Sequence, residues 1–500
     1  MLTVVPIATV HGGVVFCEKS TRIRTTDTGE QSLPSRYGQR IYFCIAKPFK
    51  MKMKETLFCL FVLFSLFSCQ NEDTQKVSEA KVDVPELLQR GDNLLKGEEW
   101  DLVQNQYAGA LKDLRAGENV NDAYIRLAEV YMTEARITGE HGHYYPAAIE
   151  VLERVKASEL EPTDIRFRAL SDLASVQLSQ HDFAAAKTTA EEAIKISPYN
   201  AQIYGALVDA NVELGNYETA VKACDKMMSI RPDLRSYSRV SYLREIHGDI
   251  QGSLEAMKMA ADAGYPGYEQ TAWTRLTLGD MLMKYGKPEA AVSQYENALA
   301  QRENYPFAIA ALADAEIHKG NHEKGEEMLK KACDIIPEFG YYVQLAQLYY
   351  DTDRKEEADK LMDEIWVMLQ DDVDSGHNMN MEYADLYLNV TEDYDKALSY
   401  AQQEFAKRPK NIDVNRMLAQ IYLKKGDMAK ARKHIDEASR TGAKYPDLLT
   451  TRGMIALAEG NKKAAMKDLE ESLSINPGQS GFLAVEAKTA VGKPVSMLQK

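Results

Sequence analysis

A unit of about 34 residues recurs along this chain of 500 residues, and its clearest copy spans residues 201–232. In that copy, apolar residues recur at intervals of three and four in two separate runs, which places each run on one face of a helix. Gly215 divides the runs, because glycine adopts the left-handed conformation that ends a helix without steric cost. Pro232 ends the second run, because proline cannot continue a helix. The unit therefore predicts a hairpin of two short helices.

The same hairpin repeats at a fixed period, as shown by Gly286 and Gly320, which occupy the same turn position in neighbouring copies. A single hairpin leaves its apolar face uncovered, so the copies are expected to stack on one another. The pattern predicts an all-α array of about eleven units over residues 85–478, interrupted by an acidic loop over residues 370–378. A short helix and tail over residues 479–500 are expected to cap the array.

The recurring residues resemble the pattern of the tetratricopeptide repeat family, in which large and small apolar side chains occupy fixed positions of both helices. The resemblance implies a right-handed superhelix, with first helices on its concave side and second helices on its convex side. Because each repeat of such an array touches only its neighbours, stability is expected to be additive along the chain. The matching residues include Leu170, Leu173, Ala174, Ala186 and Ala193, then Leu278, Gly279, Leu282, Ala291, Tyr295 and Ala298, and later Leu418, Ala419, Tyr422, Ala431 and Ala438.

The charge of the chain argues against nucleic acid as a partner. The formal net charge is -15, from 60 Lys and Arg against 75 Asp and Glu. Residues 1–68 hold nine of the basic and four of the acidic side chains, which leaves 51 basic and 71 acidic side chains in the rest. A body with this excess of carboxylates repels phosphate backbones.

An export signal precedes the repeats at residues 51–68. A short segment with two lysines is followed by an apolar run of 11 residues, Leu57–Phe67. This run is too short for a stable membrane span, and the two segments together have the parts of a secretory signal peptide. Since the signal starts only at Met51, residues 1–50 are interpreted as upstream sequence, with Met51 or Met53 as the true start.

The end of the signal, Leu66–Cys69, resembles the lipobox of bacterial lipoproteins, although Phe67 is bulkier than the residue usual at its place. The resemblance implies cleavage before Cys69 and acylation of its thiol, which would give stable membrane attachment. The residues Gln70–Asp73 resemble the short acidic surface-export signal of lipoproteins from Bacteroides-like bacteria, and a plain polar tether is the alternative. Residues 69–84 are expected to form a flexible tether. We therefore expect an outer-membrane lipoprotein, with cell-surface exposure if the export signal is used.

One part of the array departs from the repeat pattern, because serines stand where large apolar residues usually lie. Helical spacing places several polar and aromatic side chains there on the face expected to line the concave groove, and the next two units add to them. Aromatics mixed with hydrogen-bonding groups suit peptide capture. The alternative is a solvated face whose aromatics cover neighbouring repeats. The candidate groove residues are Arg235, Ser238, Tyr242, Glu245, Trp273, Asp280, Phe307 and Asp314.

Catalytic and cofactor motifs are not found among the repeats. His141 and His143 lie in an insertion expected to lengthen the turn of the second unit, but no third ligand accompanies them, so no metal site is predicted. The sequence shows neither a nucleophile elbow nor a phosphate-binding loop. Cys224 and Cys333 fall on second helices three repeats apart, so we expect both to be buried and reduced. No catalytic residue, metal or cofactor is therefore predicted.

These features favour a membrane-anchored, non-catalytic scaffold that binds partner proteins or extended peptides in the cell envelope, as the repeat family implies. The second interpretation is a SusD-like lipoprotein that binds a nutrient glycan. Such proteins also use tetratricopeptide-like helices, but they interrupt them with long loops that carry the glycan site. The third interpretation is an enzyme, for which the histidine pair at residues 141–143 is the one candidate site.

Overall fold

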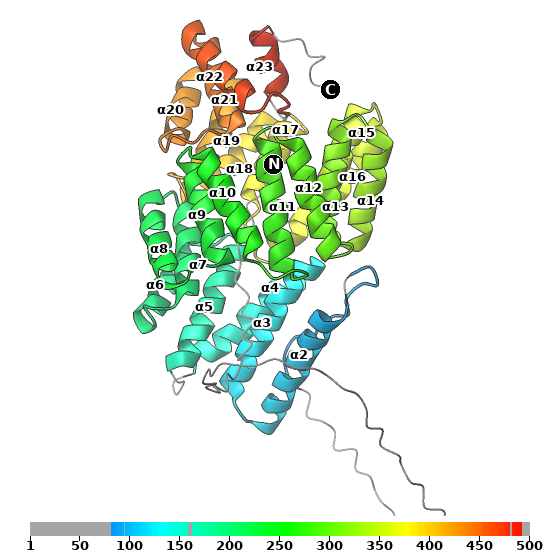
Figure 1. Ribbon diagram of the computed structural model, residues 1–500, viewed down its shortest axis with the longest axis vertical. Helices are drawn as coiled ribbons and strands as arrows, with labels where there is room; N and C mark the ends of the chain where they lie inside the picture. The colour runs from blue at the N-terminus through cyan, green and yellow to red at the C-terminus, as the bar shows by residue number, and fades with distance from the viewer. Residues whose placement is uncertain (1–81, 95, 159–162, 481–482, 493–500) are drawn as a thin grey trace, which may run out of the picture. The chain divides into compact units, whose positions relative to one another are not determined.

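The described part of the chain is all-α. Its residues form 22 α-helices, α2 to α23, and no β-strand (Figure 1). Among these helices, none is both long enough and apolar enough to cross a membrane. Residues 1–50, the expected signal peptide over residues 51–68 and Cys69 lie outside the described part, as does most of the expected tether. The computed structural model describes residues 82–94, 96–158, 163–480 and 483–492.

Ten of the units predicted from the sequence are complete helix pairs. Their first helices are α3 (Val120–Thr138), α5 (Thr163–Ser179), α7 (Ala201–Glu213), α9 (Leu234–Ile246), α11 (Glu269–Lys284), α13 (Pro306–His318), α15 (Phe339–Asp351), α17 (Asn380–Asn389), α19 (Ile412–Lys424) and α21 (Pro446–Ala458). Their second helices are α4 (His141–Lys156), α6 (Phe183–Ile196), α8 (Tyr217–Ile230), α10 (Ile250–Asp262), α12 (Pro288–Gln301), α14 (His322–Ile335), α16 (Lys355–Asp374), α18 (Tyr394–Lys407), α20 (Met428–Ala438) and α22 (Lys462–Ile475). The flanking helices are α2 (Glu98–Ala116) and α23 (Ala484–Ala490).

The helix pairs stack in sequence, and their first helices line the inner side of the stack. Each first helix packs against its own second helix, and most first helices also pack against the second helix of the preceding pair. Most successive first helices also touch one another, for example α3 with α5 and α5 with α7, whereas successive second helices in the described part make no comparable contacts. The side where first helices meet is therefore the concave side, and the expected all-α superhelix is confirmed.

Local sequence explains the turn within each pair. Gly215 and Gly426 have φ values of 75° and 76°, in the left-handed region that glycine enters at no cost. Asp182 and Asp249 begin second helices, and their side chains accept hydrogen bonds from backbone N–H groups in the first turn of those helices. Such caps satisfy donors that the helix itself leaves free. Turn and cap together fix the angle at which the two helices of a pair cross.

The superhelix returns onto itself, so that repeats far apart in sequence meet. The partners lie about 195 residues apart, between five and six repeats, and together form what we call the seam between two superhelical turns. The expectation that each repeat touches only its neighbours is therefore wrong. Seam contacts join Glu99 to Arg302, Gln180 to Ser375, His181 to Asn378, Glu213 to Arg408, Tyr217 to Ile412 and Lys284 to Asn476.

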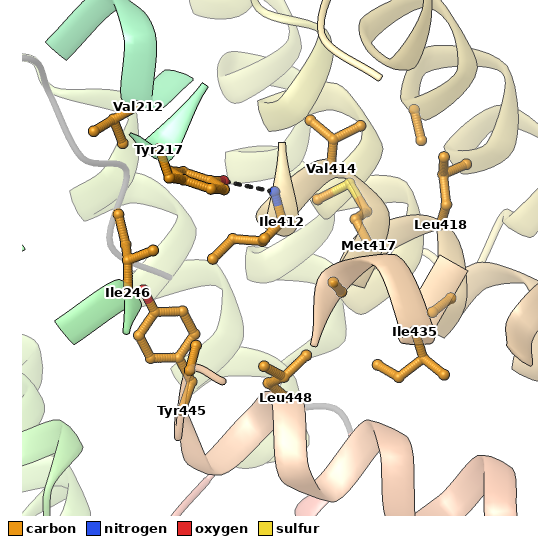
Figure 2. Packing of buried hydrophobic residues seen from close by; sticks show 14 of the residues in the cluster. Val212, Tyr217, Ile246, Ile412, Val414, Met417, Leu418, Ile435, Tyr445 and Leu448 are labelled. Carbon is orange, nitrogen blue, oxygen red and sulfur yellow. Dashed lines mark hydrogen bonds between the residues drawn. The ribbon is translucent and has the colours of Figure 1, made fainter. Parts of the chain in front are cut away.

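The hydrophobic core crosses the seam. Its largest cluster joins residues of α7, α8 and α9 with residues from α17 to α21. Figure 2 shows Val212, Tyr217 and Ile246 on one side and Ile412 and Tyr445 on the other. Because apolar area buried from water stabilises the fold in proportion to its size, this shared core ties the two superhelical turns together.

Three details of the expected organisation are corrected. The first of the eleven expected units contributes α2 alone, since residues 85–94 contain no helix. The histidine-rich insertion does not lengthen a turn, because α3 ends at Thr138 and α4 begins at His141. The acidic loop over residues 370–378 is largely helical, since α16 continues to Asp374.

The two cysteines in the described part are free thiols, but they differ in burial. Cys224 is buried as expected, whereas Cys333 is half-buried. Burial raises the pKa of each thiol to about 11, so both are protonated at neutral pH.

Candidate partner-binding face

The eight candidate groove residues lie on three first helices, α9, α11 and α13, on the inner side of the superhelix. Helix α9 begins with a capping box, in which Asp233 and Ser236 exchange side-chain and backbone hydrogen bonds. This cap fixes the start of α9 and hence the direction of its inner face. Its four candidate residues are Arg235, Ser238, Tyr242 and Glu245.

Two of the four α9 residues are already engaged within the protein. The Ser238 hydroxyl donates a hydrogen bond of 2.6 Å to the Leu234 carbonyl, and its side chain is buried. The Glu245 carboxylate is also buried, and it accepts hydrogen bonds from the Tyr285 hydroxyl at 2.6 Å and the Lys284 ammonium at 2.9 Å. Ser238 thus bonds within its own helix, whereas Glu245 joins α9 to the end of α11.

Arg235 and Tyr242 remain half-buried on the same helix. Burial lowers the pKa of Arg235 to about 10, since it penalises the charged guanidinium. Burial also raises the pKa of Tyr242, and nearby carboxylates, Glu213 first among them, add to the rise. Tyr242 packs against the core cluster that crosses the seam. The α9 part of the candidate face is therefore partly covered.

The following helices carry an aromatic and a carboxylate at equivalent positions. Trp273 and Asp280 on α11 are matched one repeat later by Phe307 and Asp314 on α13, and all four side chains are partly accessible. Because neighbouring first helices run side by side, the two pairs form a ladder of ring and carboxylate along the inner face. The two pairs thus lie on adjacent first helices of the stack.

The two carboxylates of this ladder have different electrostatic surroundings. Asp280 accepts a hydrogen bond of 2.8 Å from the Tyr295 hydroxyl. Burial raises the pKa of Asp280 to about 7, and the Asp314 carboxylate adds to the rise. Asp314 lies beside His318, with 3.4 Å between Oδ1 and Nδ1, and raises the pKa of that imidazole to about 9. His318 is therefore a cation at neutral pH and balances Asp314, whereas no cation of the described residues is shown as close to Asp280.

Phe307 lies at the edge of the face, where it packs against other rings. Its centroid is 5.4 Å from that of Tyr305 and 5.9 Å from that of Tyr341. It also borders a cavity of about 10 Å³ that Arg136 and Glu269 line, a volume that suits one water molecule. This cavity is too small for a ligand, so a partner would contact Phe307 from the inner face.

Sequence reasoning missed one pair on this face, Arg239 with Asp209. The Arg239 guanidinium is buried, and it donates to the Asp209 carboxylate at 2.9 and 2.5 Å and to the Gly205 carbonyl at 3.1 Å. Gly205 leaves room for the guanidinium, because a Cβ there would lie 3.0 Å from its Cζ. The signal was available in the sequence, since Gly205 precedes Arg239 by one repeat. This pair joins α7 to α9 and holds the inner face together.

The histidine pair at the start of α4 is part of the structural framework. His143 shares a hydrogen bond of 2.9 Å with the Glu86 carbonyl through Nε2. The His141 ring lies 5.9 Å from that of His377, and burial lowers the pKa of His141 to about 4. Within the described residues, no group of three or more His, Cys, Asp or Glu is placed to hold a metal ion.

The helix pairs match known repeat proteins. Family models described as tetratricopeptide repeat match residues 177–244, 276–338, 391–455 and 446–479. A small glutamine-rich tetratricopeptide repeat-containing protein of Saccharomyces cerevisiae is 34% identical over 86 residues, which cover 17% of this chain and 25% of the yeast protein. This chain thus spans only a quarter of that relative.

Two solved structures are similar over larger parts of the chain. A tetratricopeptide repeat protein of Parabacteroides merdae shares 19% identity, with a TM-score of 0.32, over 53% of this chain and 99% of that one. The APC/C hetero-tetramer Cut9–Hcn1 shares 13% identity, with a TM-score of 0.40, over 79% of this chain and 66% of that one.

Proposed function

We propose that this superhelix of tetratricopeptide repeats is a non-catalytic scaffold that binds partner proteins or peptides in the cell envelope. Tetratricopeptide repeats generally mediate protein–protein interactions, and the family models that match four segments support that role. The binding site is the inner face of α9, α11 and α13. The single observation that carries this choice is the ladder of Trp273, Asp280, Phe307 and Asp314, which repeats one recognition element in two successive units.

The chemistry of the ladder favours an extended segment with basic side chains. An aromatic ring offers a large contact area at low entropic cost, and its face attracts a cation. Within the described part of the chain, Asp280 has a neighbouring carboxylate and no cation as close as His318 is to Asp314. An ammonium or guanidinium group of a partner would therefore stabilise the charged form of Asp280. Two such elements, one repeat apart, would engage two side chains of the same extended segment.

We further propose that the scaffold is an outer-membrane lipoprotein attached through an acylated Cys69. The support is the order of the signal at residues 51–68, the lipobox-like Leu66–Cys69 and the polar tether at residues 69–84. Replacing Cys69 by Ser should abolish incorporation of labelled palmitate and release the chain from the membrane fraction. Palmitate incorporation that persists in the Cys69→Ser chain would refute the lipid anchor at Cys69. This result would not bear on the proposed binding face.

The binding face is tested by cross-linking in cells, followed by purification of the mature chain and identification of the attached proteins. The test variant carries Trp273→Ala and Asp280→Asn, where Asn keeps an acceptor for the Tyr295 hydroxyl. The matched control is Tyr265→Ala, because Tyr265 is 80% exposed and lies in the loop before α11, off the ladder. We expect one envelope protein to be enriched by the native chain and the control and lost from the test variant.

Two results would contradict this assignment. A partner retained by the test variant would place binding on the convex side or at an end of the array. A partner lost equally from the Tyr265→Ala control would show that the ladder is not the determinant. A third variant, Tyr242→Ala with Trp273→Ala, extends the test to the α9 part of the face.

A further inference from the structure

The seam joins the two superhelical turns chiefly through loops and helix ends. At its centre, the Arg440 guanidinium donates to the Gly215 carbonyl at 2.7 Å and to the Lys410 carbonyl at 2.9 Å. The Asn411 amide donates to the Glu213 carbonyl at 2.9 Å. Gly215 leaves no room for a side chain there, because a Cβ would overlap the backbone of Lys410. The two edges are thus in direct contact.

This mode of contact differs from the packing within a turn. Consecutive helices pack along their lengths, whereas among described helices of different superhelical turns α4 and α16 make the closest contact, and that contact is small. Most of the seam hydrogen bonds join a turn or a helix end to a loop between pairs, and the buried cluster that contains Tyr217, Ile412 and Tyr445 crosses the seam beside them. Opening the seam would break these hydrogen bonds and separate this cluster while every helix pair stayed intact, as in a local opening below global unfolding.

The seam also covers part of the candidate partner-binding face. The Lys284 ammonium, which holds Glu245 of α9, lies 3.7 Å from the centroid of the Tyr445 ring, and Tyr445 precedes α21 in the next superhelical turn. Tyr242 packs in the same cluster, and burial together with Glu245 and Tyr242 raises the pKa of Tyr445. The α9 part of the face is thus closed by residues from the second superhelical turn.

We infer that the seam is a latch, which opens as a unit and so controls access to the α9 part of the partner-binding face. This inference rests on the proposed function for what enters when the latch opens. The opening itself needs no partner and is measured on the chain alone. If the seam is a latch, two things are expected. Distant seam contacts open together, and Tyr242 becomes accessible to solvent when they open.

A disulfide across the seam provides the test. A Cβ built on Gly142 lies 3.6 Å from the Cβ of Ser375, within the roughly 3.5–4.5 Å that disulfides span. Gly142 belongs to α4 and Ser375 follows α16, so Gly142→Cys with Ser375→Cys locks the seam at one point. The control is Ser375→Cys alone, which cannot form the bridge. Both are compared oxidised and after reduction with dithiothreitol.

The first measurement is hydrogen exchange in residues 408–414, which contain the Ile412 amide bonded to Tyr217. This peptide lies in another part of the seam from the lock. We expect oxidation to slow its exchange several-fold in the locked chain, reduction to restore it, and amides of α8 to stay unchanged. Equal rates in locked and control chains would refute a latch, because the contacts would then open independently. Slower exchange of the α8 amides in the oxidised chain would also refute the latch, because the disulfide would then stabilise the whole fold and not the seam alone.

The second measurement is oxidation of side chains by hydroxyl radicals, read by mass spectrometry. Tyr242 and Tyr445 should be oxidised more slowly in the locked chain than in the control, while Tyr265, exposed in either state, should not change. Unchanged labelling of Tyr242 with slowed seam exchange would mean that the seam opens without exposing the face. Neither readout uses a partner, so failure of the proposed function would leave both results as they stand.

Discussion

The hydroxyl of Tyr217 accepts a hydrogen bond of 2.9 Å from the backbone N–H of Ile412, a residue 195 positions further along the chain. Tyr217 is the first residue of α8 and Ile412 the first of α19, and both are buried. One phenol thus satisfies an N–H group at the start of a helix in another superhelical turn. Four predictions follow from this seam and from the inner face beside it.

Replacing Tyr217 by Phe should destabilise the chain while leaving its shape unchanged. The Ile412 N–H would lose its acceptor in a buried position, which costs about 1–3 kcal/mol. The midpoint of urea unfolding should fall accordingly. The same change at exposed Tyr265 should alter the free energy of unfolding by no more than about 0.5 kcal/mol. Equal midpoints for the two variants would contradict the seam bond.

Two turn glycines, Gly215 and Gly426, allow the cost of backbone strain to be measured apart from the cost of a steric clash across the seam. Gly215 and Gly426 have nearly the same positive φ, so Ala at either costs about 1–2 kcal/mol in strain. A Cβ at Gly426 meets nothing within 4 Å, whereas at Gly215 it would overlap the backbone of Lys410. Gly215→Ala should therefore destabilise the chain by at least about 1 kcal/mol more than Gly426→Ala, on the scale typical of steric overpacking. Similar unfolding midpoints for the two variants would show that the backbone of Lys410 moves aside without a cost in stability.

The buried Arg239 should be far more sensitive to replacement than an exposed arginine. Arg239→Met leaves the Asp209 carboxylate buried without its partner, a loss of about 3–5 kcal/mol. Arg166→Met removes an exposed pair with Glu192 and should cost about 0–1 kcal/mol. Adding Asp209→Asn to Arg239→Met should recover part of the loss. Thermal unfolding of the four chains checks all of these values.

Buried Glu382 should make stability depend on pH. Burial raises its pKa to about 7, and its Oε2 atom has no hydrogen-bond partner among the described residues. The folded state therefore binds a proton that the unfolded state releases, so this contribution to stability is complete below about pH 4.5 and is lost as pH rises to 7. Glu382→Gln should stabilise the chain at pH 8 by on the order of 2 kcal/mol. The gain should vanish at pH 4.5.

The control for this titration is Glu326, whose pKa is lowered to about 2 by its hydrogen bond to Arg354. Its contribution is present above about pH 4.5 and is lost as pH falls toward 2, the opposite direction. Glu326→Gln should thus weaken the chain at neutral pH and have no effect at the acid end. If both Gln variants followed the same pH course, burial of Glu382 would not be the cause.

The local part of this fold could be predicted from sequence, because the determinants are local. Gly215 and the 3.6-residue periodicity define a hairpin whatever surrounds it, and the spacing of Trp273 and Phe307 places both on one face. The acidic stretch at residues 370–378 misled the prediction, because α16 continues to Asp374 although aspartate is a weak helix former.

The seam could not be predicted, because the rotation from one repeat to the next sets it. A small change in that rotation, accumulated over five to six repeats, decides whether Tyr217 meets Ile412 or solvent. No spacing within one repeat encodes this rotation. The same cause explains Glu245, which has the polarity expected of a groove residue but is held by Lys284, beside Tyr445 of another superhelical turn.

The 195-residue offset between seam partners also restricts how this chain can evolve. An open solenoid gains or loses a unit at little cost, because each unit presents the same surface to the next. Here, deletion of one 34-residue unit between Tyr217 and Ile412 would move every later seam partner out of register at once. The number of repeats is thus part of the specification of the fold, and relatives that keep the seam should differ in length at their ends or in their loops, but not in the count of units between.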